Sequence, residues 1–477
     1  MRLLVLLAVI ALPALGGAQV AALSSSDSAL VVRILLAEDR RDSSDAALAL
    51  GARQSDPRVR FLATRALGRI RDPKFAARDS LALPQSSAPK IWREPAWRLR
   101  YRALGAQKDD CTALRTALAD SAWQVRLRAA DLVTDKCASD QSIISTLRTW
   151  IDALPRNASR RSRNQVSWHA AAHAAVALAR AQPAEAGPRV RALATHRQWE
   201  VRMYAARAAA IRSDTTTLRT LVRDSNDNVK EAGIDALSKL TAHADDALYV
   251  AALSANGAQA VRAAAIALKG SPRDDVRAVL NKTFERWVAR RNASERDARV
   301  ALLEAAGRPV TDDRPPPLRI DLPPQAVALA LGQDARLRVT MAPSSGGGSF
   351  VVRLRGDVAP IMAARVLQLA RAGYYNGGNW HRVEADFVIQ GGGPGTNEYV
   401  GYEHYFRDEL GTVPHARGTL GMSTRAHDTG DAQWFVNLKD NPRLGRDYTV
   451  FAEVVEGMDV VDGILEGDVI STVRALP

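Results

Sequence analysis

A short stretch near the C-terminus, Trp380 to Gly393, gathers side chains that could act on one ligand. It reads W-H-R-V-E-A-D-F-V-I-Q-G-G-G, so Arg382, Phe387 and Gln390 fall at offsets 0, +5 and +8. The alternation and the closing glycines predict a strand, a tight turn, a second strand and a loop. A cation, an aromatic ring and an amide could therefore face one groove.

This stretch resembles the active-site signature of the cyclophilin-type peptidyl-prolyl isomerases, F-H-R-x-x-x-x-F-x-x-Q-G-G, with Trp380 in place of the first Phe. Four further segments match the family in order and approximate spacing. They are G-T-L-G-M-S at 418–423, Q-W-F-V at 433–436, R-L-G-R-D-Y-T-V-F at 443–451 and E-G-M-D-V-V at 456–461. The resemblance covers nearly all of residues 335–477 and implies a cyclophilin-like closed β-barrel with flanking helices. It also implies peptidyl-prolyl cis-trans isomerase (rotamase) activity.

The chemistry of this reaction makes few demands on a catalyst. A prolyl peptide bond rotates over a barrier of about 18–20 kcal/mol because twisting destroys amide resonance. The catalyst needs a donor to the prolyl nitrogen, a dry pocket for the ring and a hold on the neighbouring backbone, but no metal or cofactor. The resemblance implies catalytic roles for all three signature residues: Arg382 as the donor, Gln390 on the substrate backbone and Phe387 against the ring.

The resemblance also implies which residues contact the substrate around this centre. Val388, Phe435 and Leu444 are expected to line the proline pocket with Phe387, and Gln433 to form a polar wall. Trp380 and His381 are assigned to the barrel core rather than to chemistry.

Three positions depart from the family pattern. Tyr448 stands where many members carry His, a change that keeps a ring and a hydrogen-bonding tip. Arg443 replaces a frequent Trp, which argues against tight binding of cyclosporin. Ser423 and Thr424 replace the first two residues of a common A-N-A; they are expected to hold the substrate, while Arg425 could crowd or charge the adjoining specificity pocket.

The start of the chain reads as a targeting segment. Met1-Arg2 precedes an apolar run to Leu15 and the small residues Gly16-Gly17-Ala18, which predicts a signal peptide over 1–18. The alternative is an uncleaved membrane anchor, because weakly apolar residues continue to Leu23. After cleavage no membrane insertion is expected, and the mature chain is expected to be periplasmic, with secretion as a further possibility.

The two cysteines, Cys111 and Cys137, flank a predicted helical hairpin whose antiparallel packing would bring them to the same end. An exported chain permits a disulfide there; the alternative is two unpaired buried thiols.

Residues 24–306 are rich in Ala, Leu and Arg, and they repeat one phrase: a polar turn, then V-R or a variant, then small residues three or four apart. The copies lie at 56–70, 120–132, 199–211, 227–237 and 259–268, with a degenerate unit at 97–105. Asp or Pro would start a helix in each unit, and the spaced Ala and Leu would bury one stripe against the next helix. This pattern resembles HEAT-type repeats and predicts an all-α solenoid, an architecture that presents a concave surface to protein partners.

Two further features favour plain structural interpretations. His169 and His173 lie four residues apart on a predicted helix, but the Glu of H-E-x-x-H and a third ligand are missing, so no metal site is predicted. The net charge of +13 comes from arginines dispersed at helical spacing, which indicates a solvated surface rather than a nucleic-acid partner.

Residues 307–334 are predicted to be a linker, with five prolines between Val310 and Pro324. A hairpin is expected over 335–355 and a helix over 357–373. The whole sequence thus predicts an exported isomerase that assists folding of proline-containing polypeptides, with the solenoid for protein contact. A proline-binding scaffold or chaperone with little turnover is the alternative.

Overall fold

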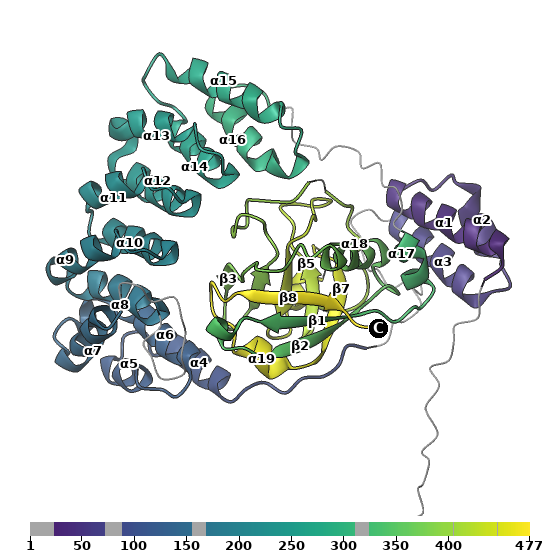
Figure 1. Ribbon diagram of the computed structural model, residues 1–477, viewed down its shortest axis with the longest axis horizontal. Helices are drawn as coiled ribbons and strands as arrows, with labels where there is room; N and C mark the ends of the chain where they lie inside the picture. Colours follow the sequence, from purple (N-terminus) through teal and green to yellow (C-terminus); the bar gives the residue numbers. More distant parts are fainter. Residues whose placement is uncertain (1–22, 72–87, 155–167, 311–323, 404, 446) are drawn as a thin grey trace, which may run out of the picture.

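The computed structural model describes residues 23–71, 88–154, 168–310, 324–403, 405–445 and 447–477. The predicted signal peptide and most of the proline-rich stretch lie outside these residues. The described chain is helical up to Ala305 and then forms one curled β-sheet, which confirms the predicted order of an all-α region before a barrel (Figure 1).

A curved stack of helix pairs, here called the helical arc, runs from Trp97 to Ala305. Its even-numbered helices from α6 to α16 form the inner layer, which faces the barrel, and the odd-numbered ones lie outside (Figure 1). The helices are α4 (Trp97–Ala106), α5 (Cys111–Ala117), α6 (Trp123–Leu132), α7 (Gln141–Asp152), α8 (Trp168–Ala181), α9 (Pro183–Leu193), α10 (Trp199–Ile211), α11 (Thr215–Leu221), α12 (Asp227–Thr241), α13 (Asp246–Ala252), α14 (Ala258–Leu268), α15 (Val276–Val288) and α16 (Arg296–Ala305).

Small residues set the packing of the arc. Its core is a continuous cluster dominated by buried Ala, Leu and Val, in which no helix pair covers its own apolar face. Gly233 shows how close the helices approach, because a Cβ there would lie 2.9 Å from the backbone nitrogen of Val222. Side-chain caps such as Asp110, Asp140 and Asn226 accept from the first backbone amides and fix where helices begin.

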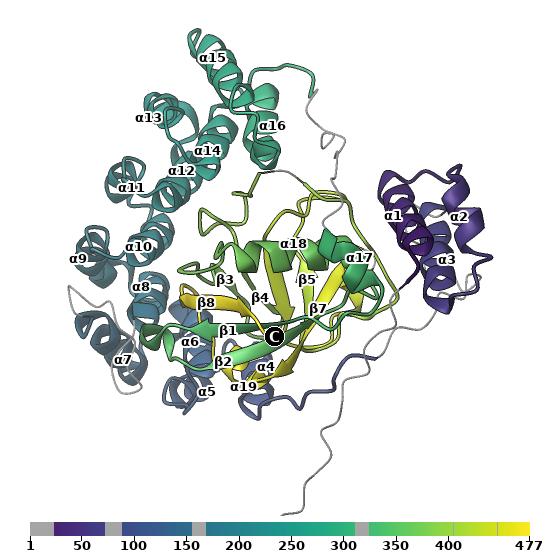
Figure 2. The same cartoon turned by 45° about the vertical axis from the view of Figure 1, so that its right-hand side comes forward.

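The first three helices form a separate core on the other side of the barrel (Figure 2). They are α1 (Ser25–Arg40), α2 (Ala46–Gly51) and α3 (Pro57–Arg71). Helix α17 (Pro324–Ala330), which lies in the segment predicted as linker, packs on this core and on α18 because its residues are mostly apolar. The helical region that the sequence presents as one block, 24–306, thus contains two cores.

The sheet domain is one eight-stranded antiparallel sheet in the order β3-β4-β6-β5-β7-β2-β1-β8. Its edges meet because the backbone at 377–380 exchanges hydrogen bonds with 467–470, for example from Trp380 N to Asp468 O at 3.0 Å. The strands are β1 (Arg336–Met341), β2 (Ser349–Leu354), β3 (Arg382–Val383), β4 (Val388–Gly391), β5 (Thr419–Met422), β6 (Trp434–Asn437), β7 (Val450–Glu456) and β8 (Ile470–Ala475).

Two helices flank the closed sheet, α18 (Pro360–Arg371) and α19 (Met458–Asp462), and their apolar faces join the barrel core. Trp380 is fully buried in that core, as expected. The predicted hairpin is formed by β1 and β2, and the predicted helix by α18. Within the described residues, no helix combines the length and hydropathy needed to cross a bilayer.

Candidate functional site

The signature stretch folds as a tight hairpin of β3 and β4. Arg382 pairs with Gln390 across the two strands, and the turn at Glu384 is closed by the amide of Phe387, which donates to the Glu384 carbonyl at 2.8 Å. The Arg382 Nη1 donates to Gln390 Oε1 at 3.3 Å, and its Nε donates to Glu384 Oε1 at 2.9 Å. The guanidinium is thus held from two sides while 40% of its side chain stays exposed.

A pocket of about 180 Å³ with an apolar floor opens beside this guanidinium. Val388, Phe435 and Leu444 form its buried floor, with Phe387 and Tyr448 packed against them. The lining comprises Arg382, Phe387, Val388, Gln390, Glu398, Tyr399, Ser423, Thr424, Arg425, Phe435, Leu444 and Tyr448. Nine of the ten residues predicted to be catalytic or substrate-binding therefore lie together in one pocket.

The tenth, Gln433, lies behind the pocket wall. Its Oε1 accepts from Gln390 Nε2 at 3.1 Å, and its own amide donates to Val400 O at 2.7 Å. Gln390 Nε2 also donates to Ser423 Oγ at 2.9 Å. Gln433 therefore orients Gln390 and the following loop rather than lining the pocket.

The Phe435 ring is fixed by its neighbours on both sides. His415 stacks on it with a centroid distance of 5.7 Å, and Tyr448 meets it edge-on at 5.6 Å. Burial lowers the pKa of His415, so its ring is neutral; Nε2 lies 3.0 Å from the Tyr448 carbonyl and Nδ1 lies 3.1 Å from the Asn437 amide. His415 was not anticipated from the sequence, because its stacking depends on pairing between strands.

Three more lining residues depend on tertiary contacts. Glu398 and Tyr399 come from the loop after β4, where nothing in the sequence indicates proximity to Arg382. Arg425, which the sequence suggested could charge the adjoining pocket, is engaged elsewhere: its Nε lies 2.7 Å from Asp297 Oδ2 and its Nη1 donates to the Glu398 carbonyl. Its positive charge is therefore opposed by a carboxylate from the helical arc.

Of the two histidines on α8, His169 contacts the isomerase domain, whereas His173 is hydrogen-bonded within the helical arc. His169 Nε2 lies 2.6 Å from the carbonyl oxygen of Glu466, and His173 Nδ1 lies 2.6 Å from Asp131 Oδ1. Tyr204 bridges the two parts, since its hydroxyl donates to Glu466 Oε2 at 2.7 Å. No cluster of three or more His, Cys, Asp or Glu suited to a metal occurs among the residues that the structure describes.

Comparison with known proteins bears on the C-terminal domain. Residues 338–477 match the family model described as "Cyclophilin type peptidyl-prolyl cis-trans isomerase/CLD". The chain is 38% identical over 134 residues to a peptidyl-prolyl cis-trans isomerase of Helicobacter pylori, an alignment that covers 27% of this chain and 83% of that protein. The chain belongs to the cyclophilin-type peptidyl-prolyl cis-trans isomerases.

The isomerase domain is thus the part of the chain that carries the family relationship. Peptidyl-prolyl cis-trans isomerase B of Escherichia coli is 40% identical over 128 residues, which are 24% of this chain and 78% of that protein. The family model begins at residue 338, so the helical region N-terminal to this domain lies outside it.

Proposed function

We propose that this chain isomerises X-Pro bonds in segments of exported proteins and that Arg382 is the catalytic donor. The observation that carries the assignment is a guanidinium on the rim of a small pocket whose floor, formed with Phe435 and Leu444, is apolar. Within this pocket Arg382 and Gln390 are hydrogen-bonded to each other, so a donor and an amide face one ligand.

The mechanism uses charge that the site holds in place before the substrate arrives. As the prolyl bond twists, conjugation is lost and the prolyl nitrogen becomes a hydrogen-bond acceptor. Arg382 keeps its charge near neutral pH and can donate to that nitrogen in the twisted state only, which lowers the barrier rather than tightening ground-state binding. Gln390, oriented by Gln433 and Ser423, holds the neighbouring backbone while the bond turns.

The exported location is supported by the N-terminal pattern and by a disulfide. The structure joins Cys111 and Cys137, with a Cα–Cα distance of 5.6 Å, and disulfides persist in oxidising compartments such as the periplasm. N-terminal sequencing of the protein recovered from cells should find a chain that begins near Gln19. A chain that retains Met1 would support the anchored alternative instead.

The activity is tested with the full-length mature chain and a short X-Pro peptide. Uncatalysed exchange takes tens to hundreds of seconds, so acceleration is measurable directly by NMR exchange or a conformer-specific protease assay. The expected result is fast exchange without any added metal or cofactor. If the protein binds the peptide but does not speed its exchange, it is a proline-binding scaffold and not an enzyme.

A further inference from the structure

A cavity of about 1350 Å³ lies between the inner layer of the helical arc and the catalytic face of the isomerase domain. Its arc wall comes from helices α6, α8, α10 and α12, for example Met203 on α10 and Asp235 on α12. Its other wall comprises β3, the turn after it, the loop around Glu398, and Leu465 with Glu466. The volume exceeds that of a drug-sized site, which spans about 300–1,000 Å³, and so suits several residues of a polypeptide.

This cavity is continuous with the proline pocket. Arg382, Phe387, Glu398 and Tyr399 line both spaces, so a polypeptide whose proline enters the small pocket meets the large cavity beside it. Residues that flank the proline would therefore contact the arc as well as the isomerase domain.

The arc also holds the shared rim in place. Asn228 on α12 donates to the Gly395 carbonyl at 3.2 Å, and Asn397 donates to Glu231 Oε2 at 2.8 Å. The guanidinium of Arg262 on α14 lies 3.8 Å from the ring centroid of Tyr399. Because three arc residues fix the loop that carries Glu398 and Tyr399, the arc is part of how the rim of the site is built.

The walls of this cavity are acidic, although the chain as a whole is basic. Seven carboxylates line it against four arginines or lysines: three carboxylates come from the arc and four from the isomerase domain. The charges of the Arg382–Glu384 pair cancel, as do those of Asp386 and its partner Arg102. Of the five other carboxyl groups, Glu231 has a pKa raised to about 7 by burial and carries only part of a negative charge near neutral pH, so four carboxylates and part of a fifth face three cations. Burial is the main reason that the pKa of Asp235 is raised, and a cation entering the cavity would be favourable there.

We propose that the cavity is a second subsite for the substrate, which binds an extended polypeptide segment with basic residues next to its proline. The proposal rests on the isomerase activity proposed above and names the substrate class of that site. An extended segment fits because the cavity is bounded on both sides, whereas a proline on a folded surface would bring more bulk than the space admits.

The test compares substrates that differ in length and flanking charge, with the full mature chain as enzyme. A four-residue X-Pro peptide reports the proline pocket alone, and twelve-residue peptides flanked by Lys or by Glu report the cavity. At low ionic strength the Lys-flanked peptide should have a KM lower by about three- to tenfold than the Glu-flanked one, and salt should reduce the difference.

Two substitutions on the arc wall sharpen the test. Asp235→Lys should raise KM for the Lys-flanked peptide and leave kcat and the four-residue peptide unchanged, while Lys239→Glu, at an exposed position, should lower that KM. Asp274→Lys makes the same charge change as the first variant on an exposed loop outside the cavity and should have no effect.

The outcomes separate the two proposals. If the four-residue peptide is isomerised but neither arc variant alters KM for the long peptides, the subsite is refuted and the isomerase stands. A preference for the Glu-flanked peptide also refutes it. Failure on every peptide, the short one included, refutes the isomerase proposal itself.

Discussion

The position of the Phe435 ring depends on a glycine directly opposite it. Gly421 on β5 pairs with Phe435 on β6, and a Cβ at Gly421 would lie 2.2 Å from Cζ of the ring. The ring therefore lies across the backbone of β5, with His415 stacked against it and Tyr448 at its edge. Only glycine leaves the space that the floor of the proline pocket requires.

Replacing this glycine should push the ring into the pocket. Gly421→Ala is expected to reduce kcat/KM by about tenfold or more, mainly through KM, because overpacking typically costs about 1–3 kcal/mol. Steady-state kinetics on a short X-Pro peptide measures this change.

Gly445→Ala provides a matched control beside the same pocket. Gly445 has a helical φ of −63°, and the nearest atom to an added Cβ is 3.4 Å away, so activity should be retained. Equal losses in both variants, or no loss in Gly421→Ala, would contradict the packing argument.

The sequence predicts which residues form the proline pocket, but it does not predict the loop residues at the rim of that pocket. Arg382, Phe387 and Gln390 come from one contiguous signature, and nine of the ten predicted residues line the pocket. Glu398 and Tyr399 were missed because a loop tied to the helical arc places them, and no local pattern encodes that contact.

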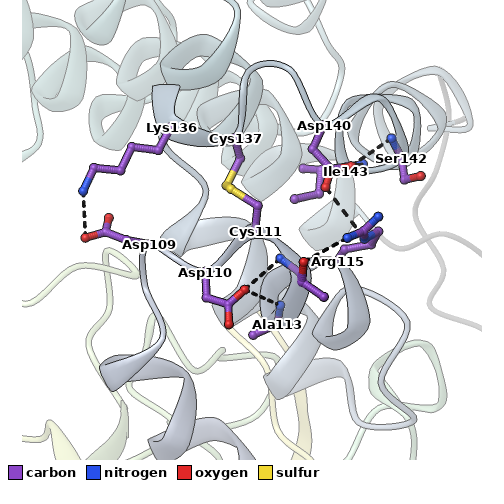
Figure 3. The surroundings of a disulfide bond; sticks show 11 residues. Asp109, Asp110, Cys111, Ala113, Arg115, Lys136, Cys137, Asp140, Ser142 and Ile143 are labelled. Carbon is purple, nitrogen blue, oxygen red and sulfur yellow. Dashed lines mark hydrogen bonds and ion pairs between the residues drawn. A yellow bond between two sulfur atoms is a disulfide. The ribbon is translucent and has the colours of Figure 1, made fainter.

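Among the secondary-structure elements, the helical hairpin formed by α5 and α6 is closed by a disulfide between its two ends. Cys111 opens α5 and Cys137 closes a 3₁₀ turn (Asp135–Cys137) after α6, at a sequence separation of 26 (Figure 3). Asp109 and Lys136 form an ion pair next to the bridge at 2.8 Å. The pairing follows from the antiparallel packing expected for these helices.

Removing this disulfide should destabilise the first part of the arc. In the chain-entropy model, closing a loop of this size contributes about 3 kcal/mol. Denaturant unfolding of wild type and of a Cys111→Ser/Cys137→Ser double variant should differ by that order, and reductant should remove the difference. Titration of two free thiols in protein prepared under oxidising conditions would contradict the bridge.

Helix α12 links the arc to the loop that borders the catalytic pocket through a buried carboxylate. The pKa of Glu231 is raised to about 7, mainly by burial and further by the nearby Asp235 and Glu398, against the opposing effects of the Asn397 hydrogen bond and Arg262. The folded state therefore binds a proton at Glu231 over a range where the unfolded chain, with a pKa near 4.5, has released it.

The sign of the pH dependence follows from this difference. The protonated Glu231 contributes roughly 3 kcal/mol to the free energy of unfolding below about pH 4.5. This contribution should be lost as the pH rises through 7. Glu231→Gln should match wild type at pH 5 and exceed it in thermal stability at pH 8, as followed by helical circular dichroism. Glu285→Gln, whose side chain is 69% exposed, is the control. A wild-type advantage at pH 8 would overturn the assignment.

In the molecule as a whole, the isomerase domain lies between two helical parts (Figures 1 and 2). The arc contacts its catalytic face, while α1–α3 contact the other side through Arg65 and Arg69, which donate to the carbonyls of Asp357 and Leu410. Both arginines pair with the buried Glu38, and losing one partner of such a cluster typically costs about 3–5 kcal/mol.

This arrangement could not be predicted from the sequence. The positions of the helices could be predicted, because a capping residue and an apolar stripe define each helix locally. For example, the repeated phrase at 199–211 forms α10, and the copy at 259–268 lies within α14. The separation of α1–α3 from the arc depends on contacts with residues more than 250 positions away, such as Arg65 with Asp357. Such contacts leave no periodic signal.

Two substitutions in the isomerase site distinguish residues that bind the substrate from the residue that speeds the reaction. Phe435→Ala removes the ring that packs on proline in both ground and transition states, so peptide affinity and rate should fall together. Arg382→Ala removes a contact made mainly in the transition state and leaves the apolar pocket intact. Arg338→Ala, at an exposed position on β1, controls for loss of positive charge.

The most direct test of the account is the rate of cis-trans exchange of a short X-Pro peptide with full-length wild type and Arg382→Ala. If Arg382 resembles other preorganised charge-stabilising donors, its loss should reduce turnover on the order of 10²-fold, with a much smaller change in peptide affinity. An Arg382→Ala variant that isomerises the peptide as fast as wild type would contradict the central role of this guanidinium.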